Sequence, residues 1–217
     1  MSAGNDHPTH SFTEVTMRPA LLFLLAVGVT PPLAAQWRFS LAAGPAATAG
    51  HSRDSIDPDQ PSILPDHPVN WVAGVARAHG AWRIGVEGHR ITSDLAVRGV
   101  SASVVTRGAL SAWGLGAELS HRVLVAAAGA SLHAGAGAVY ERWSFAVADG
   151  EARWRAAARA SLELDLPLAG RWSALVRGEG VAGQSLFRES ELPEGYRGQT
   201  GYRAALLLGV TLADNRR

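Results

Sequence analysis

Eight segments of this chain alternate apolar with polar residues, and this alternation constrains the fold more than any other feature. In residues 152–166, Trp154, Ala156 and Leu162 alternate with Arg155 and Arg159. Successive side chains of a β-strand point to opposite faces, so a period of two predicts strands with one apolar and one polar face. The predicted strands cover about residues 37–44, 70–78, 81–91, 109–120, 131–145, 152–166, 171–183 and 201–213.

The alanine-rich sixth segment also has a propensity for helix. A helix would scatter Arg153, Arg159 and Glu163 around its circumference, whereas a strand places them on one face. The shared parity therefore favours a strand. After residue 35, no uninterrupted apolar run approaches the ~18 residues of a membrane-spanning helix.

A Trp or Tyr lies near one end of almost every segment, and the end changes as the chain runs back and forth. Tyr140 and Trp143, for example, close a segment, whereas Trp154 opens the next one. Indole and phenol rings prefer the headgroup level of a bilayer, so two belts of rings around an apolar band indicate a membrane-spanning surface. The predicted aromatic girdle comprises Trp37, Trp71, Trp82, Trp113, Tyr140, Trp154, Trp172 and Tyr202.

The connections between the segments alternate in length. Tight turns at 79–80 and 167–170 alternate with long connections at 45–69, 92–108 and 184–200 and a shorter one at 146–151. We interpret 121–130 as an extension of the fourth strand followed by a turn. Membrane barrels of the bacterial outer membrane have short periplasmic turns and longer outer loops, and an even number of strands places both chain ends on the periplasmic side.

The composition narrows the function classes. Only 18% of the 217 residues are charged, 47% are apolar, and lysine and cysteine are absent. A soluble surface normally carries more charge, with lysine prominent. The absence of cysteine excludes disulfides and thiolate metal sites. The formal charge is +1 and the sequence contains no run of basic residues, so we expect no nucleic-acid partner.

The first 35 residues have the layout of a secretory leader. Met17-Arg18-Pro19 precedes an apolar run over 20–29, and the stretch 30–35 then breaks helix with two prolines and ends in the small residues Ala34 and Ala35. A run of this length is shorter than the ~20 residues that a spanning helix needs. We therefore expect a leader at 1–35, with 1–16 an overrun of the start site and 17–35 a signal peptide, followed by a barrel at 36–217. The alternative for the apolar run is a buried core helix.

Over residues 37–213 this pattern resembles the eight-stranded outer-membrane β-barrel proteins, such as the transmembrane domain of outer-membrane protein A and its smaller relatives. The resemblance implies an all-β, eight-stranded, antiparallel up-and-down transmembrane barrel, porin-like in architecture, with short periplasmic turns and longer extracellular loops. It also implies export through the signal peptide to the cell outer membrane, contact with outer-membrane lipid, and assembly by the barrel assembly machinery. We expect a monomer without a cofactor.

If the aromatic face meets lipid, the polar face lines the lumen, which eight strands leave no wider than side chains can fill. A buried charge without a partner costs several kcal/mol, so six cations facing five anions predict an ion-pair network that plugs the barrel. A functional polar track is the alternative. The predicted lumen network comprises Arg83, Glu87, His89, Glu118, Arg153, Arg155, Arg159, Glu163, Asp165, Arg177, Glu179 and Arg203, with His133 nearby. Gly114, Gly116, Gly135 and Gly137 on the same face would make room for long side chains.

Catalytic, cofactor and metal sites have little support in the sequence, and we predict none. The residues considered for a hydrolytic site are Ser120, His121 and His133, but no motif of a known hydrolase surrounds them. The first loop contains His51, Asp54, Asp57, Asp59, Asp66 and His67. Oxygen ligands of this kind can bind a cation, but without a fixed ligand spacing a solvated acidic loop is the better interpretation.

Three functions are compatible with this pattern. The leading hypothesis is a non-enzymatic, integral outer-membrane barrel with a structural or surface-binding role through its outer loops. The first alternative is a soluble secreted barrel, like a lipocalin, that encloses an apolar ligand and turns its charges outward. The second alternative is a lipid-modifying outer-membrane enzyme with a Ser/His/carboxylate cluster near one rim.

Overall fold

The computed structural model describes residues 36–50, 52–54, 62–98, 103–126, 128–146, 152–188, 196–214 and the single positions 190, 192 and 194. The predicted leader, with its divisions after residues 16 and 35, lies outside the described residues. So do several positions of the first loop that were considered for a cation, namely 51, 57 and 59.

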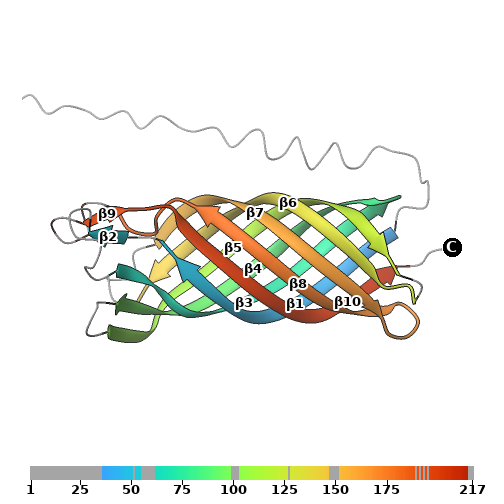
Figure 1. Ribbon diagram of the computed structural model, residues 1–217, viewed down its shortest axis with the longest axis horizontal. Coiled ribbons are helices and arrows are strands. Elements are labelled where there is room, and N and C mark those ends of the chain that lie inside the picture. The colour runs from blue at the N-terminus through green and yellow to red at the C-terminus, as the bar shows by residue number, and fades with distance from the viewer. Residues whose placement is uncertain are drawn as a thin grey trace, which may run out of the picture. The chain divides into compact units, whose positions relative to one another are not determined.

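Eight long antiparallel strands close into a barrel, as predicted (Figure 1). Each of these strands pairs with its neighbour along the chain, and β1 pairs with both β10 and β3, which closes the ring. Two short strands, β2 (Ser52–Asp54) and β9 (Tyr196–Gly198), pair with each other at one end of the barrel. The long strands are β1 (Gln36–Ala49), β3 (Ser62–His79), β4 (Trp82–Arg98), β5 (Ser103–Val125), β6 (Ser131–Phe145), β7 (Ala152–Pro167), β8 (Trp172–Gly183) and β10 (Gly201–Asp214).

The described residues contain no helix with the length and apolar character that crossing a membrane requires.

Tight turns join the strands at the end of the barrel opposite β2 and β9. Gly80, with φ of 61°, lies between β3 and β4, and Gly170, with φ of 58°, lies between β7 and β8. Glycine adopts these left-handed conformations without the steric penalty that a Cβ brings. Between β5 and β6, the Ala126 amide donates to the Ala130 carbonyl over 2.8 Å, which matches the predicted strand extension and turn over 121–130.

All three predicted long loops are partly strand, and the one at 184–200 contains β9. β1 continues to Ala49 and β3 begins at Ser62, while β4 continues to Arg98 and β5 begins at Ser103. The loop predictions 45–69 and 92–108 were therefore too long. The register shifts between Asp66 and Val69 and between Ser93 and Leu95. Such bulges break the period of two, which hides the outer part of these strands from an analysis based on alternation.

The two faces of the barrel wall differ in the way that a membrane protein requires. The side chains of Leu115, Leu162 and Leu208 are 66%, 56% and 60% exposed on the outer face, whereas Arg155 and Glu179 are 5% and 6% exposed in the interior. A lipocalin-like barrel would have the opposite arrangement. The soluble alternative is therefore wrong about which face looks outward.

Candidate functional site

Glu141 on β6 is the centre of the ion-pair network nearest the loop end of the lumen. Its side chain is completely buried. One carboxylate oxygen accepts from Arg155 Nε at 2.9 Å and from Trp143 Nε1 at 2.8 Å. The other accepts from Arg203 at 2.7 Å and lies 3.3 Å from His89 Nε2. Four strands thus direct polar side chains to one carboxylate, which offsets the cost of burying its charge.

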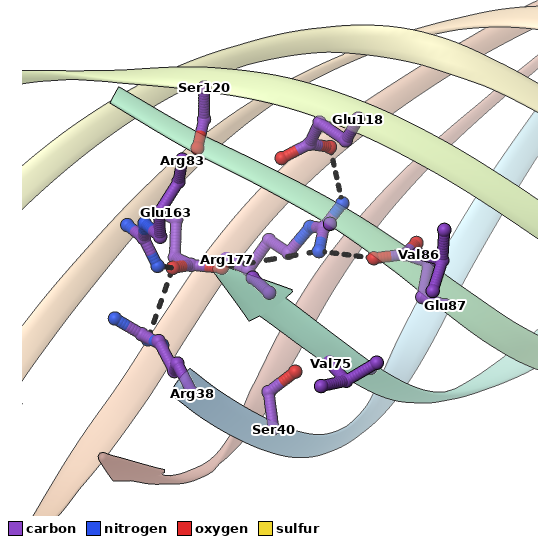
Figure 2. Close-up of a pocket in the computed structure, with 13 residues that line it drawn as sticks. Arg38, Ser40, Val75, Arg83, Val86, Glu87, Glu118, Ser120, Glu163 and Arg177 are labelled. Atoms are coloured by element: carbon purple, nitrogen blue, oxygen red, sulfur yellow. Dashed lines mark hydrogen bonds and ion pairs between the residues drawn. The ribbon is translucent and has the colours of Figure 1, made fainter. Parts of the chain in front are cut away.

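A second cluster crosses the middle of the lumen and is drawn in part in Figure 2. Arg177 on β8 donates to Glu87 over 2.9 Å and to Glu118 over 2.8 Å. Arg159 on β7 also bonds Glu87 and lies 3.1 Å from Glu118. Arg177 Nε also lies 3.7 Å from Glu179, to which Asn70 on β3 donates over 2.6 Å. Two arginines therefore share two carboxylates across the barrel axis.

A third cluster lies toward the end with the tight turns. Arg83 on β4 donates to Glu163 on β7 over 2.7 Å, and Arg38 on β1 lies 3.1 Å from the same carboxylate. Nη1 and Nη2 of Arg38 donate to the two carboxylate oxygens of Asp165. Figure 2 shows Arg38 and Arg83 converging on Glu163 from different strands. The cluster thus links β1 to β7, which are far apart along the chain.

The structure brings together most of the predicted lumen residues. Arg83, Glu87, His89, Arg155, Arg159, Glu163, Asp165, Arg177, Glu179 and Arg203 are buried, and Glu118 is largely so. Arg153 is half-buried and donates to the Leu186 carbonyl over 2.7 Å, with its guanidinium 4.5 Å from the centre of the Phe145 ring. The predicted network omitted Arg38 and Glu141, although both had the correct parity for the lumen face.

An apolar cluster closes the lumen above the charged clusters, at the loop end. Ile91, Leu110, Trp143, Phe145 and Leu186 pack together, and Leu186 comes from the connection that follows β8. Trp143, which closes the same segment as the girdle residue Tyr140, is only 1% exposed and lies in the interior. It shares the inward parity of Glu141, to which its indole N–H donates. Aromatic character alone does not determine on which face a ring lies.

The middle of the lumen contains a small cavity. The cavity lined by Arg38, Glu87, Glu118, Glu163 and Arg177 has a volume of about 40 Å³ (Figure 2). That is room for one or a few water molecules. Gly114, Gly116 and Gly135 leave space for neighbours as predicted, because a Cβ there would lie 2.5 Å from His89, 3.1 Å from Arg159 and 2.6 Å from Glu118. A Cβ on Gly137 would instead meet the backbone oxygen of Ala117 at 2.0 Å.

On the outer face, the eight girdle residues Trp37, Trp71, Trp82, Trp113, Tyr140, Trp154, Trp172 and Tyr202 are all exposed. At the loop end, Trp154 packs edge-on against Trp113 and is stacked on Tyr140, with ring centres 5.1 and 4.9 Å apart. At the turn end, the ring of Trp82 meets His121 at 4.5 Å. The rings thus lie near the two ends of the apolar surface.

The residues considered for hydrolysis are not arranged for it. Ser120 is buried on the lumen face, whereas the neighbouring His121 packs against Trp82 on the outer face. Ser131 Oγ and Asp165 Oδ2 lie 3.2 and 3.8 Å from the same nitrogen, Nε2 of His133. A serine–histidine–carboxylate relay uses both ring nitrogens. Nδ1 of His133 has no hydrogen-bond partner among the described residues.

The described part of the first loop holds no cluster suited to a metal. Asp66 is buried and bonds Arg98, and one of its oxygens lies 3.0 Å from Nδ1 of His67. Within the described ranges, no group of three or more His, Asp or Glu side chains is placed to bind an ion.

Comparison with known proteins supports the fold and identifies no function. No protein-family model and no curated protein matches the chain. Neisserial surface protein A has 9% identity and a TM-score of 0.53, covering 82% of this chain and 96% of its own. Ail of Yersinia pestis has 13% identity, a TM-score of 0.42 and coverage of 82% and 99%. The outer membrane protein AlkL has 12% identity, a TM-score of 0.45 and coverage of 98% and 97%. The match to Neisserial surface protein A, together with the strand order, shows the fold of an eight-stranded outer-membrane barrel.

Proposed function

We propose that this chain is an integral outer-membrane protein with a closed lumen, which binds partners through strands that project from the outer surface. The observation that carries the proposal is the uncharged outer band between the two belts. On β4, Ile84, Val86 and Gly88 are the outward positions between Trp82 and Arg90. Eight residues at about 3.3 Å each, tilted by about 40°, cover about 20 Å of bilayer, close to the apolar height of such barrels.

Membrane fractionation combined with heat-dependent gel mobility tests the location. We expect the protein to require detergent for extraction and to migrate differently before and after boiling, because a folded barrel resists detergent below its unfolding temperature. Recovery as a soluble periplasmic protein would contradict the proposal.

The projecting part of the molecule is built mainly by β3, β4 and β5. Pairing between β4 and β5 continues outward to Arg98 and Ser103. Within the described residues, contacts between β5 and β6 extend outward no further than the hydrogen bond from the Ala146 amide to the Ala109 carbonyl. Among those residues, 103–108 therefore form an edge strand. Its Val104 and Val105 side chains are exposed. An edge strand of this kind offers unpaired backbone groups to another extended segment.

Cysteine labelling tests which end of the barrel faces outward. The chain has no native cysteine, so a single Val104→Cys substitution reports one position. In intact cells, a membrane-impermeant maleimide should label V104C and should not label Gly170→Cys in the turn between β7 and β8. The reverse labelling pattern would contradict the orientation.

Strand addition is tested with displayed libraries of extended peptides and the protein in vesicles. The charged double variant Val104→Lys with Val105→Lys should lose peptides that the wild type retains, because lysines on an edge disfavour pairing. Val97→Lys, on the neighbouring strand β4, is the matched control. Equal retention by all three proteins would exclude the edge as the binding site.

We propose a non-enzymatic role, which the opposite orientation of Ser120 and His121 supports. The monomeric state and the contact with the barrel assembly machinery stay predictions.

A further inference from the structure

In the described part of the chain, the barrel wall has a gap at the loop end of β7. On one side, β7 pairs with β6 as far as Ala152. On the other side, its pairing with β8 begins only at Ala157 and Gly183. Residues 152–156 are therefore unpaired on the side of β8, and the connection that follows β8, residues 184–188, faces them without forming a strand.

Two arginine side chains of β7 cross this gap. Nη1 of Arg153 donates to the Leu186 carbonyl over 2.7 Å, and Nη1 of Arg155 donates to the Gln184 carbonyl over 3.1 Å. The Leu186 side chain is 3% exposed and belongs to the apolar cluster that closes the lumen. Side-chain hydrogen bonds thus hold the connection in place where the backbone ladder between β7 and β8 has ended.

A cavity of about 410 Å³ lies between the connection and β7, compared with about 40 Å³ for the cavity in the middle of the lumen. A volume of this size accommodates a small organic molecule. No aspartate or glutamate of the described residues lines it. The lining includes three arginines and three aromatic residues, namely Arg153, Arg155, Arg188, Trp143, Trp154 and Phe187.

Positive charge exceeds negative charge in the ion-pair cluster beside this cavity. Within the described residues, Arg155 and Arg203 share the single carboxylate of Glu141, and Nε and Nη1 of Arg203 are buried without a hydrogen-bond partner. The other two clusters instead join four arginines to five carboxylates, namely Arg38, Arg83, Arg159 and Arg177 to Glu87, Glu118, Glu163, Glu179 and Asp165. Because an uncompensated buried charge is costly, a single negative charge in the cavity would be stabilised.

Arg155 is fixed in an orientation suited to such an anion. Its side chain is 5% exposed, its Nε donates to Glu141 over 2.9 Å, and its guanidinium lies 5.6 Å from the centre of the Trp143 ring. Nη2 is the guanidinium nitrogen that bonds no described residue. A planar guanidinium matches the geometry of a carboxylate, and a side chain that is already ordered loses little entropy on binding.

We propose that this cavity binds a small aromatic monocarboxylate, with its carboxylate on Arg153 and Arg155 and its ring against Phe187 and Trp154. Aromatic rings pack favourably edge to face or offset, and Phe187 and Trp154 supply such surfaces. Both arginines lie on the lumen side of β7, so the site takes a soluble ligand. The inference goes beyond the proposed function and requires only the folded barrel.

The probe is naphthoate, whose binding to the full-length barrel in phosphatidylcholine vesicles is measured by equilibrium dialysis, with empty vesicles subtracted. Arg153→Gln and Phe187→Ala should each weaken binding about tenfold, because each removes a charged hydrogen bond or a ring contact. Arg90→Gln, which removes an exposed arginine of the outer face at the same end, should bind like the wild type. Naphthylmethanol, which lacks the charge, and acetate, which lacks the rings, should bind at least about tenfold more weakly than naphthoate.

Protection of a cysteine gives a second readout that leaves every arginine in place. The chain has no native cysteine, so Ser185→Cys in the lining of the cavity reports its occupancy. At about ten times its Kd, naphthoate should slow maleimide labelling of S185C about tenfold and leave V104C unchanged.

The outcomes separate this inference from the proposed function. If the wild type inserts and shows heat-dependent mobility but binds no naphthoate saturably, the site is excluded while the membrane location stands. An equal loss in R90Q would reveal an effect of total charge, and acetate binding as tight as naphthoate would reveal a general anion site; either result overturns the aromatic site. If R153Q does not fold, F187A and the protection of S185C decide. If the wild type does not insert, the proposed function fails, and the same variants test the site in detergent micelles.

Discussion

Substitution of Glu141 by glutamine is the most direct test of the ion-pair plug. The change keeps the size of the side chain and removes its charge. Arg203 then loses its carboxylate, which is its only bonded partner within the described residues. Arg155 loses the same carboxylate but keeps a 3.1 Å hydrogen bond to the carbonyl of Gln184. Removal of one member of a buried pair costs about 3–5 kcal/mol.

We therefore expect Glu141→Gln to lower the free energy of unfolding by about 4 kcal/mol, most of it from the stranded Arg203. The measurement is a urea titration of the protein refolded in phosphatidylcholine vesicles, followed by tryptophan fluorescence and by heat-dependent gel mobility. The exposed Arg107→Gln variant is the control for a change in total charge, and it should be within about 0.5 kcal/mol of the wild type.

A double variant distinguishes a lost ion pair from a disturbed fold. Adding Arg203→Gln to Glu141→Gln removes the stranded charge, so we expect about 2 kcal/mol of the loss to return. A loss below about 1 kcal/mol in the single variant would refute the reasoning. It would mean that water in the lumen stabilises Arg203 as well as the Glu141 carboxylate does. No recovery in the double variant would also count against the pair as the cause.

Three further predictions follow from the two faces of the wall. Leu206→Arg places a cation on the lipid face near the middle of β10 and should cost about 2–4 kcal/mol in vesicles, whereas Leu206→Ala should cost far less; equal effects would contradict the assignment of faces. Gly114→Ala puts a Cβ 2.5 Å from His89 Nε2 and should cost about 1–3 kcal/mol. Gly178→Ala meets nothing within 4 Å and should leave urea stability unchanged, so a similar loss in both would remove the packing argument. In planar bilayers, the wild type should show no stepwise conductance, because the charged clusters and the apolar cluster fill the lumen, and regular steps would contradict a closed barrel.

Alternation by itself predicted the number of strands, their order and the face on which each side chain lies. This works because a strand has a period of two, so that the parity of Arg155 or Leu162 assigns it to the lumen or the lipid without any long-range information. The positions of Trp82 and Trp113 near strand ends likewise followed from the preference of indole for an interface.

The sequence did not predict how far the strands extend beyond the membrane. Outside the apolar band, both faces of β4 and β5 meet water, and the register shift near Ser93 breaks the alternation. The hydrogen-bonded ladder continues there regardless, because it depends on the backbone rather than on polarity. The exposed edge at Val104 was therefore visible only in the structure.

The partners within the lumen were also decided by tertiary structure. Parity places Glu141 and Arg38 in the interior, but only the closure of the ring brings Arg38 of the first strand to Asp165, or Arg203 of the last strand to Glu141. Parity likewise places Trp143 in the interior, where its N–H donates to Glu141. The sequence alone determined which face each side chain occupies, since that is a local property of a strand. Which side chains meet depends on strand pairing and on reach across the lumen, and these exist only once the barrel has closed.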